Sequence, residues 1–451
     1  MKKISISYSD ERLITPSGLT IVGNMLDKIN FAERVNLLTA TKKRSQPRIR
    51  TGDIFLTYIG MLCQGKTEFD AVKEMKLDEE YFQLALNSHS GIPSAETLRQ
   101  RMDDVGSSIR SHLLQSNVDL FKAHKIKPTP LSNGYVPVDI DVTPFDNSKS
   151  RKEGVSRTYK GCDGYAPIMA YIGTEGYLAN TELREGKQHC QKHTPDFLRE
   201  TLKLCHQMTD KQLLIRLDAG NDAAVNLGIL LEDGSWFCVK RNPRSAETKE
   251  EWLAKVKECC VDVRNPREGK TVYIGSSWKN VKYKDSNGKN QTLCTRIVYE
   301  VTERTSLPDG QMILPKVDVN TWWTNLGLTD SEVIELYHAH GECEQFHSEI
   351  KTDMDVERLP SGKFETNELV LELTVLAYNI LRMIGQESIR CGKAPKAKRE
   401  VHRRRLRTVI NNLILIAGHL TKHARRFTLS LGRSNIWRDA FRAVHARFAI
   451  V

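Results

Sequence analysis

Long apolar runs and paired cysteines are both missing from this chain of 451 residues. No stretch of 18 apolar residues occurs, and the N-terminal Met-Lys-Lys leads into a polar run over residues 5–12 where a secretory signal would be apolar. We therefore expect a cytosolic protein that is not inserted in a membrane. The ten cysteines form no C-x-x-C pair, which argues against a structural zinc site.

The chain also lacks a glycine-rich phosphate loop and a Ser-His-Asp order with the spacing of a known hydrolase family. Acids are scarce at the C-terminal end, where Arg390 to Val451 contains 16 Lys or Arg but only Glu400 and Asp439 as acids. The net charge of this segment is therefore +14. Because the net charge of the whole chain is +11, that of the remaining residues is near -3. A polyanionic partner is indicated, nucleic acid before membrane, with a solvated basic surface as the alternative.

The apolar spacing divides the chain into several regions, as its length leads one to expect. Helical spacing over 1–130 predicts a helical DNA-binding region, and helical spacing over 361–451 predicts a basic helical C-terminal region, with helices at 366–385, 399–427 and 435–448. Between them we expect an α/β core over 131–240 and 329–360, interrupted by a β-rich insertion over 241–328.

The order of elements in the core predicts its topology. The expected strands are 135–142, 166–172, 176–182, 213–217 and 236–239, and the expected helices are 195–208 and 223–231. Three strands, a helix, a strand, a helix and a strand is the order of a ribonuclease H-like fold, in which the fourth strand pairs in parallel with the first.

One N-terminal segment could contact DNA directly. In Ile92-Pro-Ser-Ala-Glu-Thr-Leu-Arg-Gln-Arg-Met102, Ser94 is a good helix N-cap, and Arg99 and Arg101 lie near the start of the helix. Such a helix can enter a DNA groove, as in helix-turn-helix proteins, or can be an ordinary charged surface helix.

Three aspartates that accompany two apolar strands are candidate metal ligands. Asp139 and Asp141 lie on one face of the first core strand, and Asp218 ends the fourth strand, just before Gly220. Each aspartate alone is more often a turn or cap residue. Together with an acid on a following helix they suit two Mg²⁺ ions, with Mn²⁺ as a substitute, in an in-line displacement at phosphorus.

The acid on the following helix is expected within Tyr337 to Lys351. At 100° per residue, Tyr337, His340, Glu344 and Lys351 fall on one stripe of a helix, so an acid is held among basic and hydroxyl groups. Glu342 and Glu349 compete with Glu344 for this role. They lie about 200° and about 140° round the helix from Glu344 and should not share its face.

These residues resemble the DDE transposases of bacterial insertion sequences, in the group marked by Y-x2-R-x3-E-x6-K and most closely insertion-sequence family 1380. Tyr337, Glu344 and Lys351 match that signature in identity and spacing, with His340 at the Arg position. The family's first acid sits in a D-x-T sequence, here Asp141-Val-Thr143, which favours Asp141 over Asp139. Its second acid follows the fourth strand and matches Asp218.

The resemblance implies roles for further residues. Tyr337, His340 and Lys351 would contact DNA; because histidine is only partly charged near neutrality, its role could pass to Lys351 or Arg358. In relatives of the group a tryptophan of the insertion stacks on a flipped base, and Trp322 and Trp323 are candidates. Packing of the insertion against the core is the alternative for both indoles.

The leading hypothesis is a transposase that binds the terminal inverted repeats of its own insertion sequence, cleaves the DNA with divalent metal ions and transfers the strands to a target. Such an enzyme would act on double-stranded DNA as a homodimer in the bacterial cytoplasm and would be associated with the nucleoid when bound to DNA. Two alternatives stay open: a ribonuclease H-like nuclease without strand transfer, and a domesticated, non-catalytic DNA-binding protein.

Overall fold

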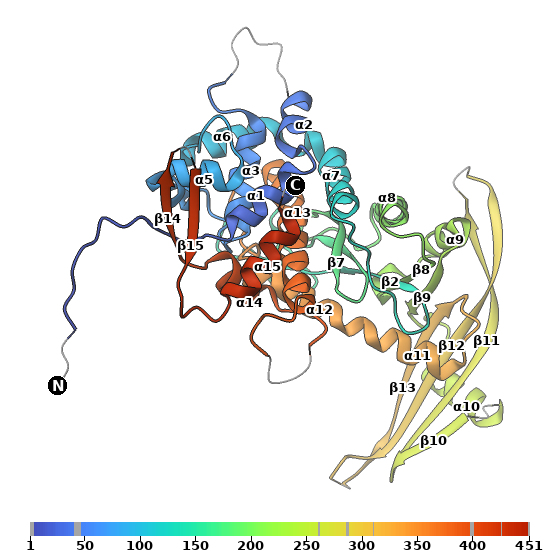
Figure 1. Cartoon of the computed structure of the whole chain (residues 1–451). Coiled ribbons are helices and arrows are strands. Elements are labelled where there is room, and N and C mark those ends of the chain that lie inside the picture. The colour runs from blue at the N-terminus through green and yellow to red at the C-terminus, as the bar shows by residue number, and fades with distance from the viewer. Residues whose placement is uncertain are drawn as a thin grey trace.

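The chain folds into a helical body and a sheet-based body that lie side by side (Figure 1). The computed structural model describes residues 4–39, 47–259, 262–285, 288–309, 311–396, 401–424 and 426–449. The first and the last helices both belong to the helical body, while long strands project from the sheet-based body. Within the described part of the chain, no helix is both long and apolar enough to cross a membrane.

The sheet-based body is built on one nine-stranded sheet of order β10-β11-β12-β13-β9-β8-β2-β6-β7. Its five core strands are β2 (Val136–Val142), β6 (Ile168–Ile172), β7 (Tyr177–Glu182), β8 (Leu213–Leu217) and β9 (Trp236–Arg241). β2 pairs antiparallel with β6 and parallel with β8, and β8 pairs parallel with β9. The predicted parallel pairing of the fourth strand with the first is therefore confirmed.

Strand β8 shows why the core forms as it does. All five of its residues, Leu-Leu-Ile-Arg-Leu, are buried, as expected for a parallel strand covered on both faces. Leu213, Ile215 and Leu217 belong to the main hydrophobic core, whereas Leu214 belongs to a second cluster with Trp322. The helices that follow the predicted pattern are α8 (Thr194–Met208) and α9 (Ala224–Asp233).

The inserted segment extends the core sheet instead of forming a separate one. It consists of α10 (Lys249–Cys259), β10 (Asp262–Arg267), β11 (Lys270–Lys284), β12 (Asn290–Ser306) and β13 (Met312–Thr324). β13 pairs antiparallel with β9 from Thr321↔Arg241 to Thr324↔Cys238. The prediction of strands in this stretch is confirmed, and their pairing fixes the insertion to the core.

The helical body combines both ends of the chain around one long buried helix, α13 (Phe364–Arg390), which contacts α3, α6, α7, α14 and α15. The prediction of N-terminal helices is confirmed. The elements before β2 are β1 (Leu13–Ile14), α1 (Leu19–Asp27), α2 (Phe31–Leu38), α3 (Thr51–Leu62), η1 (Phe69–Ala71), α4 (Val72–Leu77), α5 (Glu79–Leu86), α6 (Ala95–Val105), η2 (Gly106–Ile109) and α7 (Arg110–Ala123).

The prediction of a helix over 399–427 is wrong for most of that stretch. Residues 397–400 and 425 lie outside the described residues. The rest forms α14 (Leu406–Val409), a π turn (Ile410–Ile414) and a hairpin of β14 (Gly418–His423) and β15 (Arg426–Leu431), with β1 on the other edge of β14. Phe427, Leu429 and Leu431 alternate with polar residues. This alternation is typical of a strand and describes the stretch better than helical spacing does. The predicted last helix is confirmed as α15 (Arg438–Phe448).

The segment expected to be one regular helix changes pitch instead. It runs as α11 (Asp330–His338), a 3₁₀ turn (Ala339–Glu342), α12 (Cys343–Ser348) and a π turn (Glu349–Asp353). A capping box at Thr329 and Glu332 starts it. Because the pitch changes, angles counted at a constant 100° per residue are only a guide to which side chains share a face.

Candidate active site

Asp139 and Asp141 face the same side of β2 but have different surroundings. Asp139 is 4% exposed and is held by both forks of Arg216, with Nε–Oδ1 at 2.6 Å and Nη2–Oδ2 at 2.7 Å. The two residues are register partners on β2 and β8. His340 Nδ1 lies 3.0 Å from Asp139 Oδ1. Although burial opposes its charge, Arg216 and His340 lower the pKa of Asp139, so this acid is ionised and already neutralised.

Asp141 and Asp218 form a pair of half-buried acids at the adjacent ends of β2 and β8. Burial raises the pKa of Asp218, and the negative charge of Asp141 raises it further. Asn221 Nδ2 donates to Asp218 Oδ1 at 2.6 Å, and the Val142 N–H donates to Asp141 Oδ1 at 2.8 Å. A cation bound by both carboxylates would remove the repulsion between them.

The residues of the spaced signature lie along the segment that passes these acids. The pKa of Tyr337 is raised by burial and then by the nearby charges of Asp218 and Asp141. Lys351 Nζ donates to the Pro144 carbonyl oxygen at 2.5 Å, and burial lowers the pKa of this lysine. Tyr337, His340 and Lys351 therefore face the same end of the sheet as the two aspartates.

Glu344 is exposed on α12, between two buried residues of the same turn, Cys343 and Phe346. Among the described residues, its side chain makes no hydrogen bond or ion pair. The structure therefore places Glu344 on the segment that passes the aspartates, without a contact that joins it to them. Its role stays a prediction.

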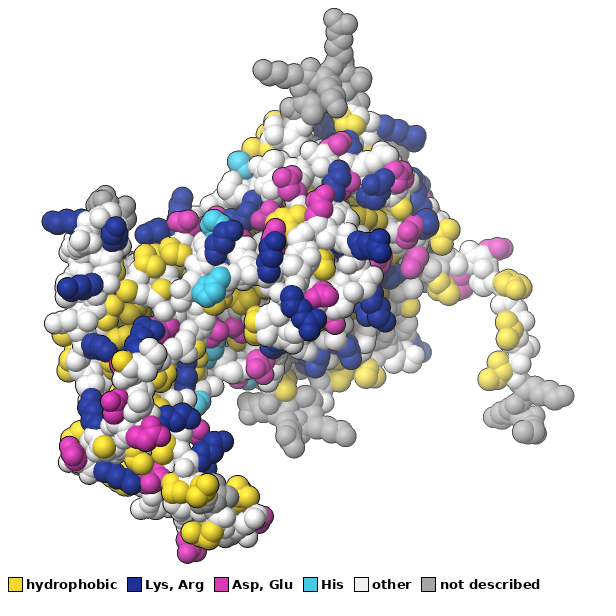
Figure 2. All heavy atoms as spheres, turned by 180° about the vertical axis from the view of Figure 1, so that it is seen from behind, with side chains coloured by type: hydrophobic (Ala, Val, Ile, Leu, Met, Phe, Trp, Pro, Cys, Tyr) yellow, Lys and Arg dark blue, Asp and Glu magenta, His cyan; other side chains and the backbone are white. Residues whose placement is uncertain are grey.

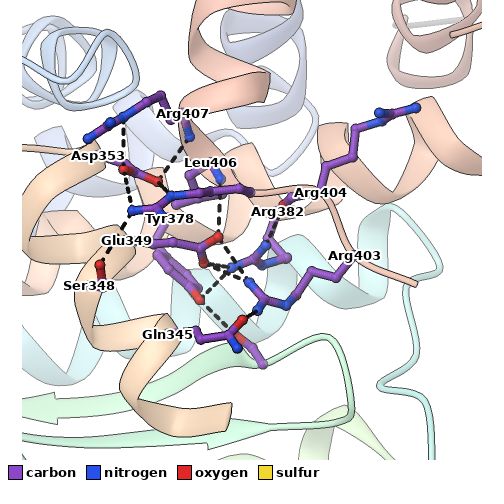
Figure 3. A network of polar contacts seen from close by, with 12 residues as sticks. Gln345, Ser348, Glu349, Asp353, Tyr378, Arg382, Arg403, Arg404, Leu406 and Arg407 are labelled. Carbon is purple, nitrogen blue, oxygen red and sulfur yellow. Dashed lines mark hydrogen bonds and ion pairs between the residues drawn. The ribbon is translucent and has the colours of Figure 1, made fainter. Parts of the chain in front are cut away.

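Glu349, one of the alternatives to Glu344 as the third acid, belongs to a buried network of ion pairs and hydrogen bonds (Figure 3). It is 2% exposed and pairs with Arg382, which is 1% exposed. Arg403 Nη1 lies 2.9 Å from Glu349 Oε1, and the Leu406 N–H donates to the same oxygen at 3.2 Å. An acid with all these partners has little capacity left for a metal ion, which removes Glu349 from the candidates.

A second acid of the π turn, Asp353, is bound in the same way (Figure 3). Arg405 Nε lies 2.8 Å from Asp353 Oδ2, and Arg407 Nε lies 3.2 Å from Oδ1. Three arginines of the basic C-terminal region, Arg403, Arg405 and Arg407, are thus paired inside the chain. The charge of that region is only in part available to an outside polyanion.

His347 was not among the residues predicted from the sequence, and it lies next to Asp141. It is 5% exposed, and its Nε2 lies 3.3 Å from Asp141 Oδ2 and 3.6 Å from Cys343 Sγ. Its Nδ1 lies 3.0 Å from the Tyr171 hydroxyl. Although burial opposes the charge of Asp141, the hydrogen bond and charge of His347 lower the pKa of that acid. The four-residue spacing of Cys343 and His347 on a helix was the available signal.

The two tryptophans of the insertion are buried, at 0% for Trp322 and 2% for Trp323. Trp322 packs against Tyr337 with ring centroids 5.8 Å apart, and Lys240 Nζ lies 4.2 Å above its ring. The Trp323 indole N–H donates to Asp222 Oδ1 at 2.9 Å. As the structure stands, neither ring is accessible to a base, so the packing alternative describes both indoles here.

The two arginines of α6 also have partners within the chain. Ser94 accepts from the Thr97 N–H, which confirms the predicted helix start. Arg99 is exposed and pairs with Glu96 at 2.6 Å. Arg101 donates to the Ile49 carbonyl oxygen at 3.1 Å and to the Thr51 hydroxyl at 2.5 Å. Arg99 could exchange its surface partner for a phosphate, whereas Arg101 serves to hold α6 in place.

The family model described as transposase DDE domain, group 1, matches residues 1–450 of this chain. Among solved structures, one similar chain is the piggyBac transposase in a cryo-EM synaptic complex with hairpin DNA, at 12% sequence identity and a TM-score of 0.37. The match covers 82% of this chain and 74% of that chain. A search of the curated proteins finds no match. The family match carries the assignment, and the structural likeness adds no weight to it.

Proposed function

Because this chain belongs to the transposase DDE domain family, group 1, and is therefore a DDE transposase, we propose that it moves an insertion sequence of the Y-x2-R-x3-E-x6-K group, most like family 1380. In this proposal it binds the terminal inverted repeats, cleaves the element from its flanks and joins the freed 3′-hydroxyls to target DNA. The single observation that carries the proposal, beyond the family match, is the pair of mutually repelling acids Asp141 and Asp218 at adjacent strand ends.

The core is proposed to be of the ribonuclease H-like type. The strand order β7-β6-β2-β8-β9, with β6 antiparallel to β2 and with β2, β8 and β9 parallel, supports this. The carboxyl ends of the parallel strands are the usual place for a ligand in open α/β sheets. Asp218 directly follows β8 at such an end, and Asp141 is next to last in β2.

Asp141, Asp218 and Glu344 would hold two Mg²⁺ ions, with Mn²⁺ able to substitute. Oxygen-only donors suit these hard cations, and a bound cation would relieve the effect of the Asp141 charge on Asp218. When bound, such ions activate the attacking water or hydroxyl and stabilise the leaving oxygen at phosphorus. Glu344 is exposed without a partner in the described chain, so it is free to turn toward the aspartates when DNA and metal are present.

His340 is proposed to contact a DNA phosphate in place of the signature arginine. Burial opposes its charge, but Asp139 raises its pKa above the usual 6.5, so the cationic form is favoured. Asp139 is itself anchored by Arg216, whose Nη1 also donates to the Leu336 carbonyl oxygen at 2.9 Å. The contacts that link Arg216 to Asp139 and Asp139 to His340 thus hold the imidazole near the acids. They also favour the positive charge that a histidine would otherwise lack near neutral pH.

DNA would be held by basic side chains that remain unpaired. Lys and Arg side chains are spread over the helical body and the insertion (Figure 2). In the C-terminal region, five of them are exposed and make no ion pair within the described residues: Lys393, Lys396, Arg426, Arg433 and Arg442. Two element ends have to be held at once, so a homodimer on double-stranded DNA is the simplest proposed assembly.

The proposal is tested with Glu344→Gln and with Glu342→Gln as the matched control, since Glu342 is an exposed acid two residues away. Oligonucleotides that carry the element ends are incubated with each variant and Mg²⁺. Cleavage and strand transfer should be lost in Glu344→Gln and kept in Glu342→Gln. Undiminished cleavage by Glu344→Gln would contradict the assignment.

The products separate the alternatives. Joined element-end and target strands support a transposase, and cleavage without joined products would indicate a nuclease instead. DNA binding without metal-dependent cleavage by the wild-type chain would indicate a domesticated binding protein.

A further inference from the structure

Three donor atoms of different chemistry converge next to the proposed Mg²⁺ ligands. They are Asp141 Oδ2, His347 Nε2 and Cys343 Sγ, and all lie within 4.8 Å of one another. Cys343 is 1% exposed, its thiol forms no disulfide, and it lies four residues before His347 on α12. The catalytic chemistry proposed above uses neither the thiol nor the imidazole.

Two of the three distances between these atoms are close to the edges of a tetrahedral metal site, and the third is within 4.8 Å. Zn²⁺ lies about 2.0 Å from nitrogen and oxygen ligands and about 2.3 Å from sulfur, so at a tetrahedral angle N and O are about 3.3 Å apart and N and S about 3.5 Å apart. In the structure His347 Nε2 lies 3.3 Å from Asp141 Oδ2 and 3.6 Å from Cys343 Sγ. An ion could therefore be bound with little movement of these side chains.

The far side of the imidazole is already arranged as behind a metal-bound histidine. Such a histidine usually donates its other N–H to a fixed acceptor. His347 Nδ1 lies 3.0 Å from the Tyr171 hydroxyl, and that hydroxyl donates to Met169 Sδ at 3.2 Å. With its proton turned toward the sulfur, the Tyr171 oxygen can accept from Nδ1–H, which leaves the Nε2 lone pair directed at Asp141 and Cys343.

We propose that Asp141, Cys343 and His347 form a binding site for a borderline-soft transition metal ion such as Zn²⁺ or Co²⁺, distinct in chemistry from the Mg²⁺ site but sharing Asp141 with it. On binding, the Cys343 S–H bond breaks, its proton passes to solvent, and the sulfur–metal bond forms. In the metal-bound form the single proton of neutral His347 is on Nδ1, and the Nε2–H hydrogen bond to Asp141 is replaced by bonds from Nε2 and the Asp141 carboxylate to the metal. Sulfur and nitrogen ligands favour such ions strongly over Mg²⁺.

A consequence is that Zn²⁺ should inhibit the enzyme by capturing a ligand of the Mg²⁺ site. This consequence rests on the proposed function, whereas the binding of the ion does not. A failure of the binding experiment would remove the transition-metal site and leave the transposase proposal intact. Transition-metal binding without any DNA cleavage would leave the transition-metal site intact and contradict the transposase proposal.

The binding test uses the full chain, stripped of metal, with Cys259, Cys260 and Cys294 replaced by serine to limit binding elsewhere; the first and the last of these are exposed. Titration with Co²⁺ should give a thiolate-to-cobalt charge-transfer band that saturates at one equivalent and is displaced by Zn²⁺. Cys343→Ser in this background should abolish the band. Absence of the band, or its persistence in Cys343→Ser, would overturn the proposal.

Two further measurements keep the test decisive if Cys343→Ser fails to fold. X-ray absorption of the Zn²⁺-bound parent should show one sulfur ligand, and a shell of only nitrogen and oxygen would overturn the site. Tyr171→Phe should weaken Co²⁺ binding by about 10-fold to 100-fold, as expected when a metal-bound histidine loses the acceptor of its other N–H. Unchanged affinity in a folded Tyr171→Phe protein would contradict the role given to the hydroxyl.

Discussion

Two pairs of acids lie in or beside the helical segment 330–353, and the surroundings of the two pairs differ. Glu349 and Asp353 are matched by arginines and backbone N–H groups, so their charges are neutralised inside the chain. Asp141 and Asp218 lie at adjacent strand ends and have no arginine partner among the described residues, and the charge of Asp141 raises the pKa of Asp218. The first arrangement stabilises the fold. The second arrangement is expected to cost stability, and in the proposed function it serves the binding of metal ions.

The largest effect on activity is expected from Asp218→Asn. Metal-dependent cleavage should fall by about 10³-fold or more, because the acids act as one unit. The free energy of unfolding should stay the same or rise, since the repulsion from Asp141 disappears. Cleavage assays and urea unfolding measure the two quantities. A clear loss of stability would show that Asp218 is a structural acid and would break the comparison.

The opposite outcome is expected for the paired acids. Glu349→Gln and Asp139→Asn should each reduce the free energy of unfolding by about 3 to 5 kcal/mol, because each leaves a buried arginine, Arg382 or Arg216, without its charge partner. Denaturant titration checks this. Glu96→Gln, which affects only the exposed pair with Arg99, serves as control and should change stability by less than about 1 kcal/mol.

The affinity for element-end DNA is expected to depend on pH through His340. Asp139 raises the pKa of His340, so its positive charge is complete below the ordinary value of 6.5 and is lost as pH rises through the raised pKa. Affinity for element-end DNA should fall over that window by about tenfold, the value of one charge-assisted hydrogen bond of about 1.5 kcal/mol. His340→Arg should remove this pH dependence, because arginine keeps its charge. A pH profile of the wild type that matches that of His340→Arg would contradict the phosphate contact.

The smallest effects separate the two arginines of α6. Arg99→Ala should leave stability within about 0.5 kcal/mol and, if Arg99 meets a phosphate, reduce the slope of log affinity against log salt by about one. Arg101→Ala should instead reduce stability by about 1 to 3 kcal/mol, because its bonds to Ile49 and Thr51 are lost. Binding at several salt concentrations and thermal unfolding distinguish them. Equal behaviour of the two variants would remove the distinction.

Local patterns were sufficient for most elements of the fold. The all-apolar run at β8 and the N-cap at Ser94 were assigned correctly, since burial on both faces and capping are properties of neighbouring residues. The hairpin of β14 and β15 was missed because the surrounding basic segment has apolar residues at both helical and alternating spacing. Pairing with β1, about 400 residues earlier, helps to decide between them, and no local pattern shows that partner.

The site divides in the same way. The sequence by itself predicted the spaced residues Tyr337, Glu344 and Lys351 and the two strand-end aspartates, because periodicity ties position to side-chain direction. The structure places the aspartates at adjacent strand ends, whereas the role of Glu344 stays a prediction. Only the tertiary structure decided that Arg216 neutralises Asp139 and that Arg382 and Arg403 neutralise Glu349. It also brought His347 to Asp141 from more than 200 positions away. Whether an acid is free or paired depends on partners that folding brings together from distant parts of the chain.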